Sequence, residues 1–441
     1  MDIFHVLSKK IKGGILTEDE IRFFVESVTN GSMADYQISA MLTAMYIHGL
    51  NRAELFSLTE HMAHSGDFLP LSDNHLLVDK HSSGGVGDKI SLICAPLIAS
   101  LGMKIAKMSG RGLGHTGGTV DKLEAIPQMD VNLSADAFWN VLDQVGCVMS
   151  GQTGNFCPAD KKMYALRDVT ATVDSLPLIA ASIMSKKIAS GAKNIILDVK
   201  CGHGAFMKDL QQAQALAQLM LDIGTSFQRN VVVLITDMNE PLGFCVGNAL
   251  EVTEAAEVLK GTEIEDLTEI SVAIAGYAMV LTGLEKNPRR AMEKAKEHLK
   301  NGKALLKFRQ MIAMQKGDPS FLEDSKKLPH CGNCMEVKAL ASGCIKDIDS
   351  ERIGHASMLL GAGREKKDDI LDYGAGIVLK KKISDPVKEQ ETLAVLFYTD
   401  GKKAAQAEKV AQQAFQIEDS APKKKTKILK VLSNIELEGD A

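Results

Sequence analysis

The residues best suited to chemistry lie between positions 107 and 124, in the segment KMSGRGLGHTGGTVDKLE. Five glycines fall within nine of these residues, at positions 110, 112, 114, 117 and 118. Glycine at this density lets the backbone adopt positive φ angles and approach a ligand closely. The ammonium of Lys107, the hydroxyls of Ser109, Thr116 and Thr119, and the backbone N–H groups suit a phosphate oxyanion. The segment therefore predicts an anion-binding loop.

The same segment contains the pattern G-x-G-x-x-G at 112–117, directly after a strand-like apolar run. A dinucleotide-binding fingerprint also requires an acidic residue about 20 positions further on, at the end of a second strand. Asp130 comes too early for that role, and the loop is rich in hydroxyls and cations. Dinucleotide binding and a purely structural glycine-rich turn are therefore alternatives, and the residues favour phosphate.

A second candidate anion-binding loop follows the apolar residues 76–78. It holds Lys80, Ser82, Ser83 and three glycines, and it leads into a helix-like run over 90–98. The loop does not match the P-loop pattern, because no G-K-[ST] closes it. Two such loops, each after a parallel-type strand, would meet at the carboxyl edge of one sheet. One phosphate could then be bound from both sides.

A third set of polar residues is Arg167, Ser182 and Lys186. Ser182 and Lys186 are four residues apart, which places them on one face of a helix. If the three side chains converge, they could recognise a planar heterocycle that carries two carbonyls with an N–H between them. On their own these residues are weak evidence, since isolated Arg and Lys residues usually lie at the surface.

The elements that would position these residues can be predicted from the pattern of the chain. Three helices are expected within residues 1–65, from the capping pairs Thr17 with Glu20, Ser32 with Asp35, and Asn51 with Glu54. Strands at 194–199 and 231–236 alternate with helical segments at 210–221 and 249–259, which favours an α/β fold with a parallel sheet. Helices are also expected at 161–166 and 178–188. The glycine-containing stretch 344–379, a strand at 392–398 and a helix at 404–415 predict an α+β C-terminal unit.

The totals exclude several classes of protein. A chain of 441 residues with 45% hydrophobic and 24% charged residues is typical of a globular protein of about two or three domains. Its net charge of −5 argues against a general nucleic-acid binder. The N-terminus lacks a signal-peptide pattern and no apolar run reaches membrane-spanning length, so a cytosolic location is expected.

The eight cysteines are scattered, and Cys331 and Cys334 form a C-x-x-C that lacks the second half of a zinc site. Solvent-edge thiols are favoured there over a metal or redox role.

Taken together, Lys80-His81-Ser82, the 107–124 segment and the Arg167, Ser182, Lys186 set resemble the thymidine and pyrimidine nucleoside phosphorylase family. Residues 109–124 match the family pattern of Ser-Gly-Arg-Gly-Leu, Thr-Gly-Gly-Thr, Asp and Glu, and the resemblance extends over nearly the whole chain. It implies a pentosyltransferase of nucleoside salvage. Such an enzyme converts uridine, thymidine or deoxyuridine and phosphate reversibly to the free base and a pentose 1-phosphate, with inversion at C1′.

The resemblance also assigns roles to residues. It places phosphate at Lys80, His81, Ser82, Ser91, Lys107, Met108, Ser109 and Thr119, and the base at Arg167, Ser182 and Lys186. Catalysis would depend on His81, Arg167 and Lys186. A pyrimidine anion leaves poorly unless its charge is neutralised, so fixed cations and a histidine that titrates near neutrality beside carbonyl O2 suit the reaction. A purely structural role for His81 is the alternative.

The resemblance implies three structural units and a homodimer. Residues 1–65 and 160–190 would form a helical domain that binds the base and dimerises. Residues 70–155 and 191–330 would form an α/β domain that binds phosphate. Residues 340–441 would form an α+β subdomain. Substrates would lie across the cleft between the helical and α/β domains, and closure of the domains would exclude water.

Relatives of broad specificity hold a potassium ion near this site. The corresponding ligands here are the carbonyls of Gly87, Lys89, Leu242 and Cys245, and the Glu254 carboxylate. Lys89 stands where some relatives have a hydroxyl residue, although a backbone carbonyl does not depend on the side chain. Without the resemblance, Glu254 would be interpreted as a solvated helix acid. Gln128 replaces a glycine common in relatives, which implies a loop difference without loss of chemistry.

Lys107 bears on specificity. Thymidine-restricted relatives tend to have an apolar residue there, so the lysine favours a phosphorylase that accepts several pyrimidine nucleosides, and a thymidine-restricted enzyme is the alternative. Leu113, Ile179 and Phe206 are candidates to line the base and sugar pocket, or else pack in the core. An anthranilate-type phosphoribosyltransferase is one alternative function. Such an enzyme needs acidic residues that hold magnesium on a pyrophosphate, and no convincing acidic pair stands beside these loops in the sequence. The other alternative is a non-catalytic nucleoside-binding protein.

Overall fold

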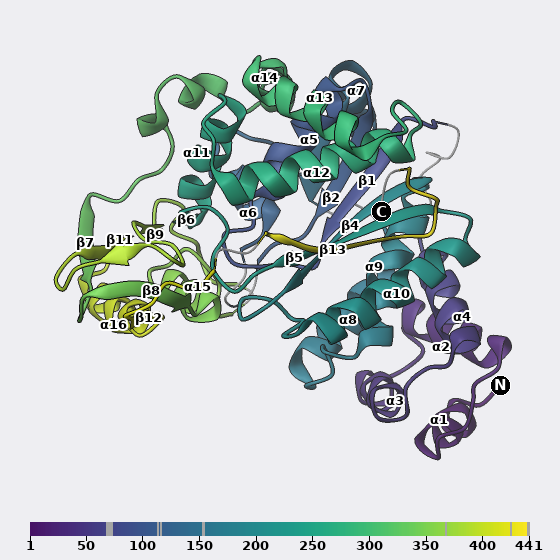
Figure 1. Ribbon diagram of the computed structural model, residues 1–441. Coiled ribbons are helices and arrows are strands. Elements are labelled where there is room, and N and C mark those ends of the chain that lie inside the picture. Colours follow the sequence, from purple (N-terminus) through teal and green to yellow (C-terminus); the bar gives the residue numbers. More distant parts are fainter. Residues whose placement is uncertain are drawn as a thin grey trace.

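A six-stranded sheet forms the centre of the computed structural model (Figure 1), which describes residues 1–67, 74–112, 114, 117–151, 155–366, 368–423 and 426–438. The strands lie in the order β13-β5-β4-β1-β2-β3. They are β1 (Leu77–Ser82), β2 (Lys104–Ser109), β3 (Cys147–Gly151), β4 (Asn194–Cys201), β5 (Asn230–Asp237) and β13 (Ile428–Ser433). All pairs are parallel except β13 with β5. The predicted strands at 194–199 and 231–236 and the predicted parallel sheet are confirmed.

Strand β1 lies where the order of the sheet reverses. The chain proceeds from β1 to β2 and β3 on one side, and to β4 and β5 on the other. Because β1 and β2 pair in parallel from Leu77 opposite Lys104, their last residues, Ser82 and Ser109, lie at the same carboxyl edge. In open α/β sheets, ligands bind outside this edge at the point of reversal. The two predicted anion-binding loops both begin there.

Alternating apolar residues of the central strands face two separate cores. On β5, Val231, Val233 and Ile235 pack into one core, whereas Val232 and Leu234 pack into the other. This period of two is the reason why each strand can bury both faces under helices.

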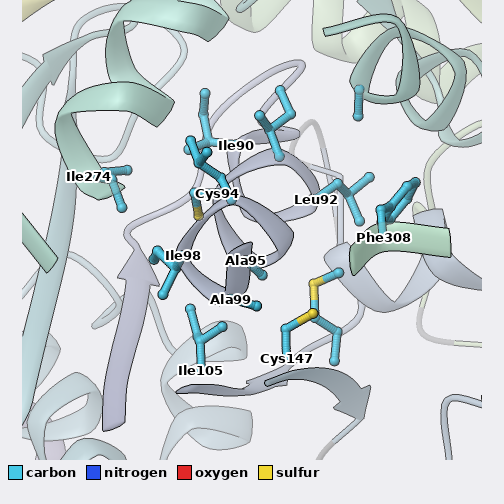
Figure 2. Close-up of a cluster of buried hydrophobic side chains, with 14 of the residues drawn as sticks. Ile90, Leu92, Cys94, Ala95, Ile98, Ala99, Ile105, Cys147, Ile274 and Phe308 are labelled. Carbon is cyan, nitrogen blue, oxygen red and sulfur yellow. The ribbon is translucent and has the colours of Figure 1, made fainter. Parts of the chain in front are cut away.

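The first core lies under six helices. They are α5 (Ile90–Ser100), α7 (Ala135–Val145), α11 (Asn248–Leu259), α12 (Glu265–Leu281), α13 (Pro288–Lys300) and α14 (Lys303–Met314). Figure 2 shows α5 at the centre, with Leu92 beside Phe308 of α14 and with Ile98 toward Ile105 of β2. Helix α5 is apolar all round and buried, so it can pack on the sheet and on α12 and α14 at once. Its N-terminus is thereby held at the carboxyl edge of the sheet.

The opposite core is formed by the sheet and a group of seven helices. They are α1 (Ile3–Ile11), α2 (Glu18–Thr29), α3 (Asp35–His48), α4 (Arg52–Ala63), α8 (Pro158–Val169), α9 (Leu176–Ala189) and α10 (Leu210–Ser226). The capping boxes at Thr17 and Asn51 are confirmed. The prediction for Ser32 is wrong, because Ala34 is the N-cap and the Gln37 side chain bonds back to it. Helix α1 was not predicted.

Two small sheets form the C-terminal unit. One has the order β6-β9-β11-β7 and the other β10-β8-β12. The strands are β6 (Cys245–Val246), β7 (Asn333–Lys338), β8 (Gly343–Ile348), β9 (Gly376–Leu379), β10 (Pro386–Val387), β11 (Thr392–Tyr398) and β12 (Phe415–Glu418). The remaining helices are α6 (Thr119–Glu124), α15 (Ser350–Leu359), α16 (Gly401–Gln412) and the 3-10 turns Pro319–Leu322 and Ser325–Lys327.

The predicted boundary of 340–441 placed the end of the chain in the C-terminal unit. The structure instead places residues 428–433 in the main sheet. After β12 the chain returns to the main sheet, where β13 pairs with β5 from Ile428 opposite Thr236 to Ser433 opposite Val232. The backbone of β13 pairs with this edge of the sheet, and its apolar side chains pack against both cores. No helix in the described ranges combines the length and the apolar character needed to cross a membrane.

Candidate active site

Strand β1 carries three of the predicted site residues to the carboxyl edge. Lys80 and Ser82 point to the face that α5 covers, and the Lys80 Nζ lies 3.4 Å from the Ser91 hydroxyl at the start of α5. Ser82 donates to the Asp88 carboxylate at 2.5 Å. His81 points to the other face, the face that α9 approaches. Lys80 and Ser82 therefore lie on one face of the sheet, and His81 lies on the other.

The Lys80 ammonium is completely buried and lies 3.6 Å from the Asp198 carboxylate. Burial opposes its charge, but Asp88 and Asp198 hold the pKa of Lys80 above its ordinary value. Lys200 lies 2.8 Å from the same Asp198 carboxylate. Asp88 is held ionised in turn, because Lys200, Lys80 and Lys122 outweigh burial and lower its pKa. The sequence predicted Lys80 but not this network of buried carboxylates and lysines.

Strand β2 contributes Lys107 and Ser109, which alternate with Met108 between the two faces. Burial and the charge of Lys187 lower the pKa of Lys107 to about 7. The Ser109 hydroxyl is buried and has no hydrogen-bond partner among the described residues. A buried hydroxyl without a partner beside a buried amine suits an anion acceptor. Met108 packs against both cores, and its carbonyl accepts from the Lys107 Nζ at 3.3 Å.

Carboxylates shape the glycine-rich loop between β2 and α6. The Asp121 carboxylate accepts from the Gly112 N–H at 2.7 Å and from Arg364 of the C-terminal unit at 2.8 Å. A Cβ at Gly118 would lie 2.1 Å from the Gly112 nitrogen, so only glycine fits there. Thr119 is partly buried at the start of α6. Leu113 and Thr116 lie outside the described residues. The part played by Arg364 was not predicted.

Helix α9 brings together two of the three base-binding candidates, Ser182 and Lys186. Lys186 donates to the Ser182 hydroxyl at 3.0 Å, so the predicted shared helix face is confirmed. The same ammonium also bonds the Asp160 carboxylate of α8. Asp160 was not predicted as a partner, and it holds the Lys186 ammonium in place.

Arg167 is buried at the end of α8 and donates to three backbone carbonyls. Its Nε and two Nη atoms bond the carbonyls of Thr172, Leu178 and Val173 at 3.2, 3.2 and 2.6 Å. Burial lowers its pKa. A guanidinium has five N–H groups, so two remain beyond this clamp. Arg167 therefore shapes the turn between α8 and α9, a role that the sequence did not indicate.

His81 lies in the electrostatic field of both basic sets. Burial and the charges of Lys187, Lys107, Lys186 and Lys80 hold its pKa well below the ordinary value. The expectation that His81 titrates near neutrality is therefore wrong for the ligand-free protein, where the imidazole is neutral at pH 7. Burial is the largest cause of this shift and Lys187 on α9 supplies the largest charge, and sequence spacing reveals neither.

Three of the groups assigned to potassium, the Leu242 and Cys245 carbonyls and the Glu254 carboxylate, surround the ammonium of Lys89. The Lys89 Nζ lies 2.8 Å from the Leu242 carbonyl, 2.7 Å from the Cys245 carbonyl and 2.5 Å from the Glu254 carboxylate. Glu254 is buried, so it is not a solvated helix acid. These three oxygen acceptors are already occupied by the Lys89 ammonium, so they do not fit a potassium ion as well.

The remaining candidates lie apart from these contacts. Ile179 packs partly buried against the helical core, and Phe206 is exposed. Gln128 has a φ of 63°, in the left-handed region that favours glycine. Cys334 is exposed on β7, whereas the Cys331 thiol contacts Asp372 and Thr399.

Family models and known proteins resemble this chain over most of its length. Residues 74–305 match the model described as the glycosyl transferase family α/β domain, and residues 4–66 match the helical bundle domain of the same family. Residues 344–418 match the pyrimidine nucleoside phosphorylase C-terminal domain. A pyrimidine-nucleoside phosphorylase from Geobacillus stearothermophilus is 46% identical over 398 residues, covering 90% of this chain and 92% of the relative. The protein of that name from Bacillus subtilis is 48% identical, with the same coverage.

A solved structure also shares the fold. The crystal structure of an anthranilate phosphoribosyltransferase from Thermus thermophilus matches with a TM-score of 0.58 and 18% identity, covering 71% of this chain and 99% of the other. The match supports the predicted fold class of a helical domain with a larger α/β domain.

Proposed function

Because this chain belongs to the pyrimidine-nucleoside phosphorylase family, we propose that it is a pentosyltransferase that cleaves pyrimidine nucleosides with phosphate. In this reversible reaction a phosphate oxygen bonds C1′ while the C1′–N bond breaks, and the bond's electron pair leaves with the base. The observation that carries the proposal is geometric. The parallel strands β1 and β2 bring His81 and Lys107 toward one carboxyl edge of the sheet, and the Lys187–Asp79 ion pair holds the helix of Lys186 against β1.

The phosphate would bind at the carboxyl edge beside Lys107, Ser109, Thr119 and the residues at the end of β1. Its negative charge would favour the protonated form of Lys107, so the amine would take up a proton on binding. The Ser109 hydroxyl would donate to a phosphate oxygen. Lys80, Ser82 and Ser91 lie in direct contact with one another or with carboxylates, and they would complete and stiffen this side of the site.

The base would bind against Ser182 and Lys186, with the free N–H groups of Arg167 nearby. Negative charge develops on the pyrimidine as it departs, and a prepositioned ammonium stabilises that charge more in the transition state than in the ground state. Asp160 keeps the Lys186 ammonium in a defined place before substrate arrives. This is consistent with a site that selects planar bases with two carbonyls.

His81 would act on carbonyl O2 of the base. A neutral imidazole offers one N–H, which can donate a hydrogen bond to that oxygen. Once phosphate offsets the charges of Lys107 and Lys80, the pKa of His81 rises, and the imidazole can then hold a proton as the base leaves. Phosphate binding would thus prepare the residue that assists departure.

Further properties follow the same proposal. Lys107 favours an enzyme that accepts uridine, thymidine and deoxyuridine. The helical domain carries exposed apolar side chains at Phe4, Tyr36, Ile47 and Val169, which supports a homodimer through this domain. All eight cysteines are free thiols, as expected for the cytoplasm.

The experiment is an assay of uridine, thymidine and deoxyuridine with and without phosphate. We expect base release and pentose 1-phosphate only when phosphate is present, with all three substrates. Turnover of thymidine alone would favour the thymidine-restricted alternative. Binding of nucleoside without cleavage would indicate a binding protein and would contradict the proposal.

A further inference from the structure

We propose that the Lys89 ammonium takes the place of a potassium ion in this enzyme, which therefore needs no monovalent cation. Only the statement about enzyme activity rests on the proposed function. The statement about the occupied cation site does not. The ammonium carries the same single positive charge as the ion. Lys89 follows directly on the loop that extends from β1, and it is the residue before α5.

The geometry around Lys89 leaves none of its donors unused. The side chain has no solvent-exposed surface, and its three N–H groups meet the carbonyls of Leu242 and Cys245 and the Glu254 carboxylate. Oxygen atoms in this arrangement are the ligands that a monovalent cation would also take. The lysine therefore satisfies the same acceptors from within the chain.

The acceptor side is equally complete. The Glu254 carboxylate accepts from the Phe244 N–H at 2.7 Å and from the Cys245 N–H at 3.1 Å, in addition to Lys89. The Gly87 backbone approaches so closely that a Cβ there would lie 2.7 Å from the Leu242 carbonyl oxygen. An added ion would have to displace the ammonium from this dry, close-packed place.

Charge balance points the same way. The Lys89 ammonium pairs with the Glu254 carboxylate, and both side chains are buried, so the positive charge already has its counter-charge. Glu251 lies 3.0 Å from Lys122. A potassium ion would thus add a second positive charge where Glu254 is already neutralised, which is costly in a buried site.

The Lys89 contacts join the phosphate side of the site to the C-terminal unit. Lys122 donates to the Asp88 carbonyl at 2.8 Å, immediately before Lys89. Cys245, whose carbonyl Lys89 holds, begins β6, and β6 pairs with β9 of the C-terminal unit. Because this cation is part of the chain, the contacts between the phosphate side and the C-terminal unit do not depend on which salt is present.

The test compares the wild type with Lys89→Thr and Lys89→Met. Lys89→Thr removes the ammonium and leaves the oxygen ligands with space for an ion, whereas Lys89→Met fills the space without a charge. Lys104→Thr is the matched control, because Lys104 pairs with Asp143 at the surface. Thermal midpoint and kcat/KM are measured in potassium chloride and in tetramethylammonium chloride at equal ionic strength, and binding of thallium(I) is followed by its NMR signal.

We expect the wild type, Lys104→Thr and Lys89→Met to show no difference between the two salts. Lys89→Thr should bind thallium(I), and potassium should raise its midpoint by at least about 2 °C. Potassium-specific stabilisation of the wild type, or thallium bound to it, would overturn the inference. A folded Lys89→Thr that ignores potassium would do so too, and if that variant does not fold, the wild-type measurements decide. A wild type without phosphorolysis but with a potassium-independent midpoint would refute the function and leave this inference standing.

Discussion

The Lys187 ammonium on α9 lies 2.9 Å from each carboxylate oxygen of Asp79 on β1, and both side chains are buried. Ser190, just after the same helix, donates to Asp79 at 3.2 Å. Asp79 directly precedes Lys80 and His81, and Lys187 directly follows Lys186. One buried ion pair therefore sets the position of the proposed base-binding helix relative to the proposed phosphate-binding strand.

Lys187→Met should destabilise the protein by about 3–5 kcal/mol, because it leaves the Asp79 carboxylate buried without its partner. Adding Asp79→Asn should recover part of this loss. The free energy of unfolding in urea measures both effects, and Lys193→Met, at an exposed position beyond the same helix, is the control. A loss no larger than that of the control would mean that the ion pair does not hold α9 on the sheet.

Phosphate affinity should depend on pH through Lys107. With a pKa of about 7 in the free protein, Lys107 is protonated below pH 7 and neutral above it. Bound phosphate favours the ammonium, so binding above pH 7 takes up a proton and weakens by up to about tenfold per pH unit. The ionisation of phosphate itself cancels when the wild type is compared with Lys107→Met. Calorimetric titrations of both proteins from pH 6 to about 9 measure the ratio, and a constant ratio would contradict the assigned role.

His81→Ala should slow nucleoside cleavage by roughly 100- to 10,000-fold, in the range of general acid catalysis. Phosphate binding should change much less, because the neutral imidazole contributes no charge to it. Single-turnover cleavage and equilibrium phosphate binding separate the two quantities. Equal losses in both would indicate that His81 has a structural role.

Lys186→Ala should lower kcat/KM for uridine by roughly 10- to 100-fold, because it removes a charged hydrogen-bond donor from the departing base. The Kd of phosphate should stay the same. Lys161→Ala, on the exposed face of α8, is the control. An unchanged kcat/KM for uridine would remove Lys186 from the base-binding set.

The protein should be a dimer in solution, with a mass twice the 47.6 kDa of one chain. Ile47 on the helical domain is 67% exposed, whereas Ile370 on the C-terminal unit is 96% exposed. Both side chains are exposed, but only Ile47 lies in the domain that is proposed to dimerise. Ile47→Glu should weaken the dimer for that reason, and Ile370→Glu should not. Light scattering over a dilution series measures this, and a wild-type monomer would refute the proposed dimer.

Local features of the fold could be predicted from the sequence. The capping boxes at Thr17 and Asn51 involve residues three positions apart, so their pattern is visible in the chain. The strands at 194–199 and 231–236 are mostly apolar, as strands buried on both faces require, with Asn194, Asp198 and Thr236 as the polar exceptions. The Ser32 prediction failed because Ala34 and Gln37 offered a competing start to the same helix.

The partners of the site residues could not be predicted, because they are distant in sequence. Asp79 and Lys187 are 108 residues apart, Lys89 and Glu254 are 165 apart, and Asp121 and Arg364 are 243 apart. Spacing carries no information at such separations. The residue types that suit phosphate were visible, but the buried lysines that lower the pKa of His81 could be counted only after the chain was folded.

Besides β6, which joins its sheet from between β5 and α11, the C-terminal unit has two further connections to the rest of the chain, and the pairing of β13 with β5 anchors the second of them. One runs in through the chain before β7, and the other runs out through the chain after β12. A unit connected at several points cannot rotate freely, as a terminal domain on one linker could. These connections keep Arg364 of this unit within reach of Asp121, beside the glycine-rich loop.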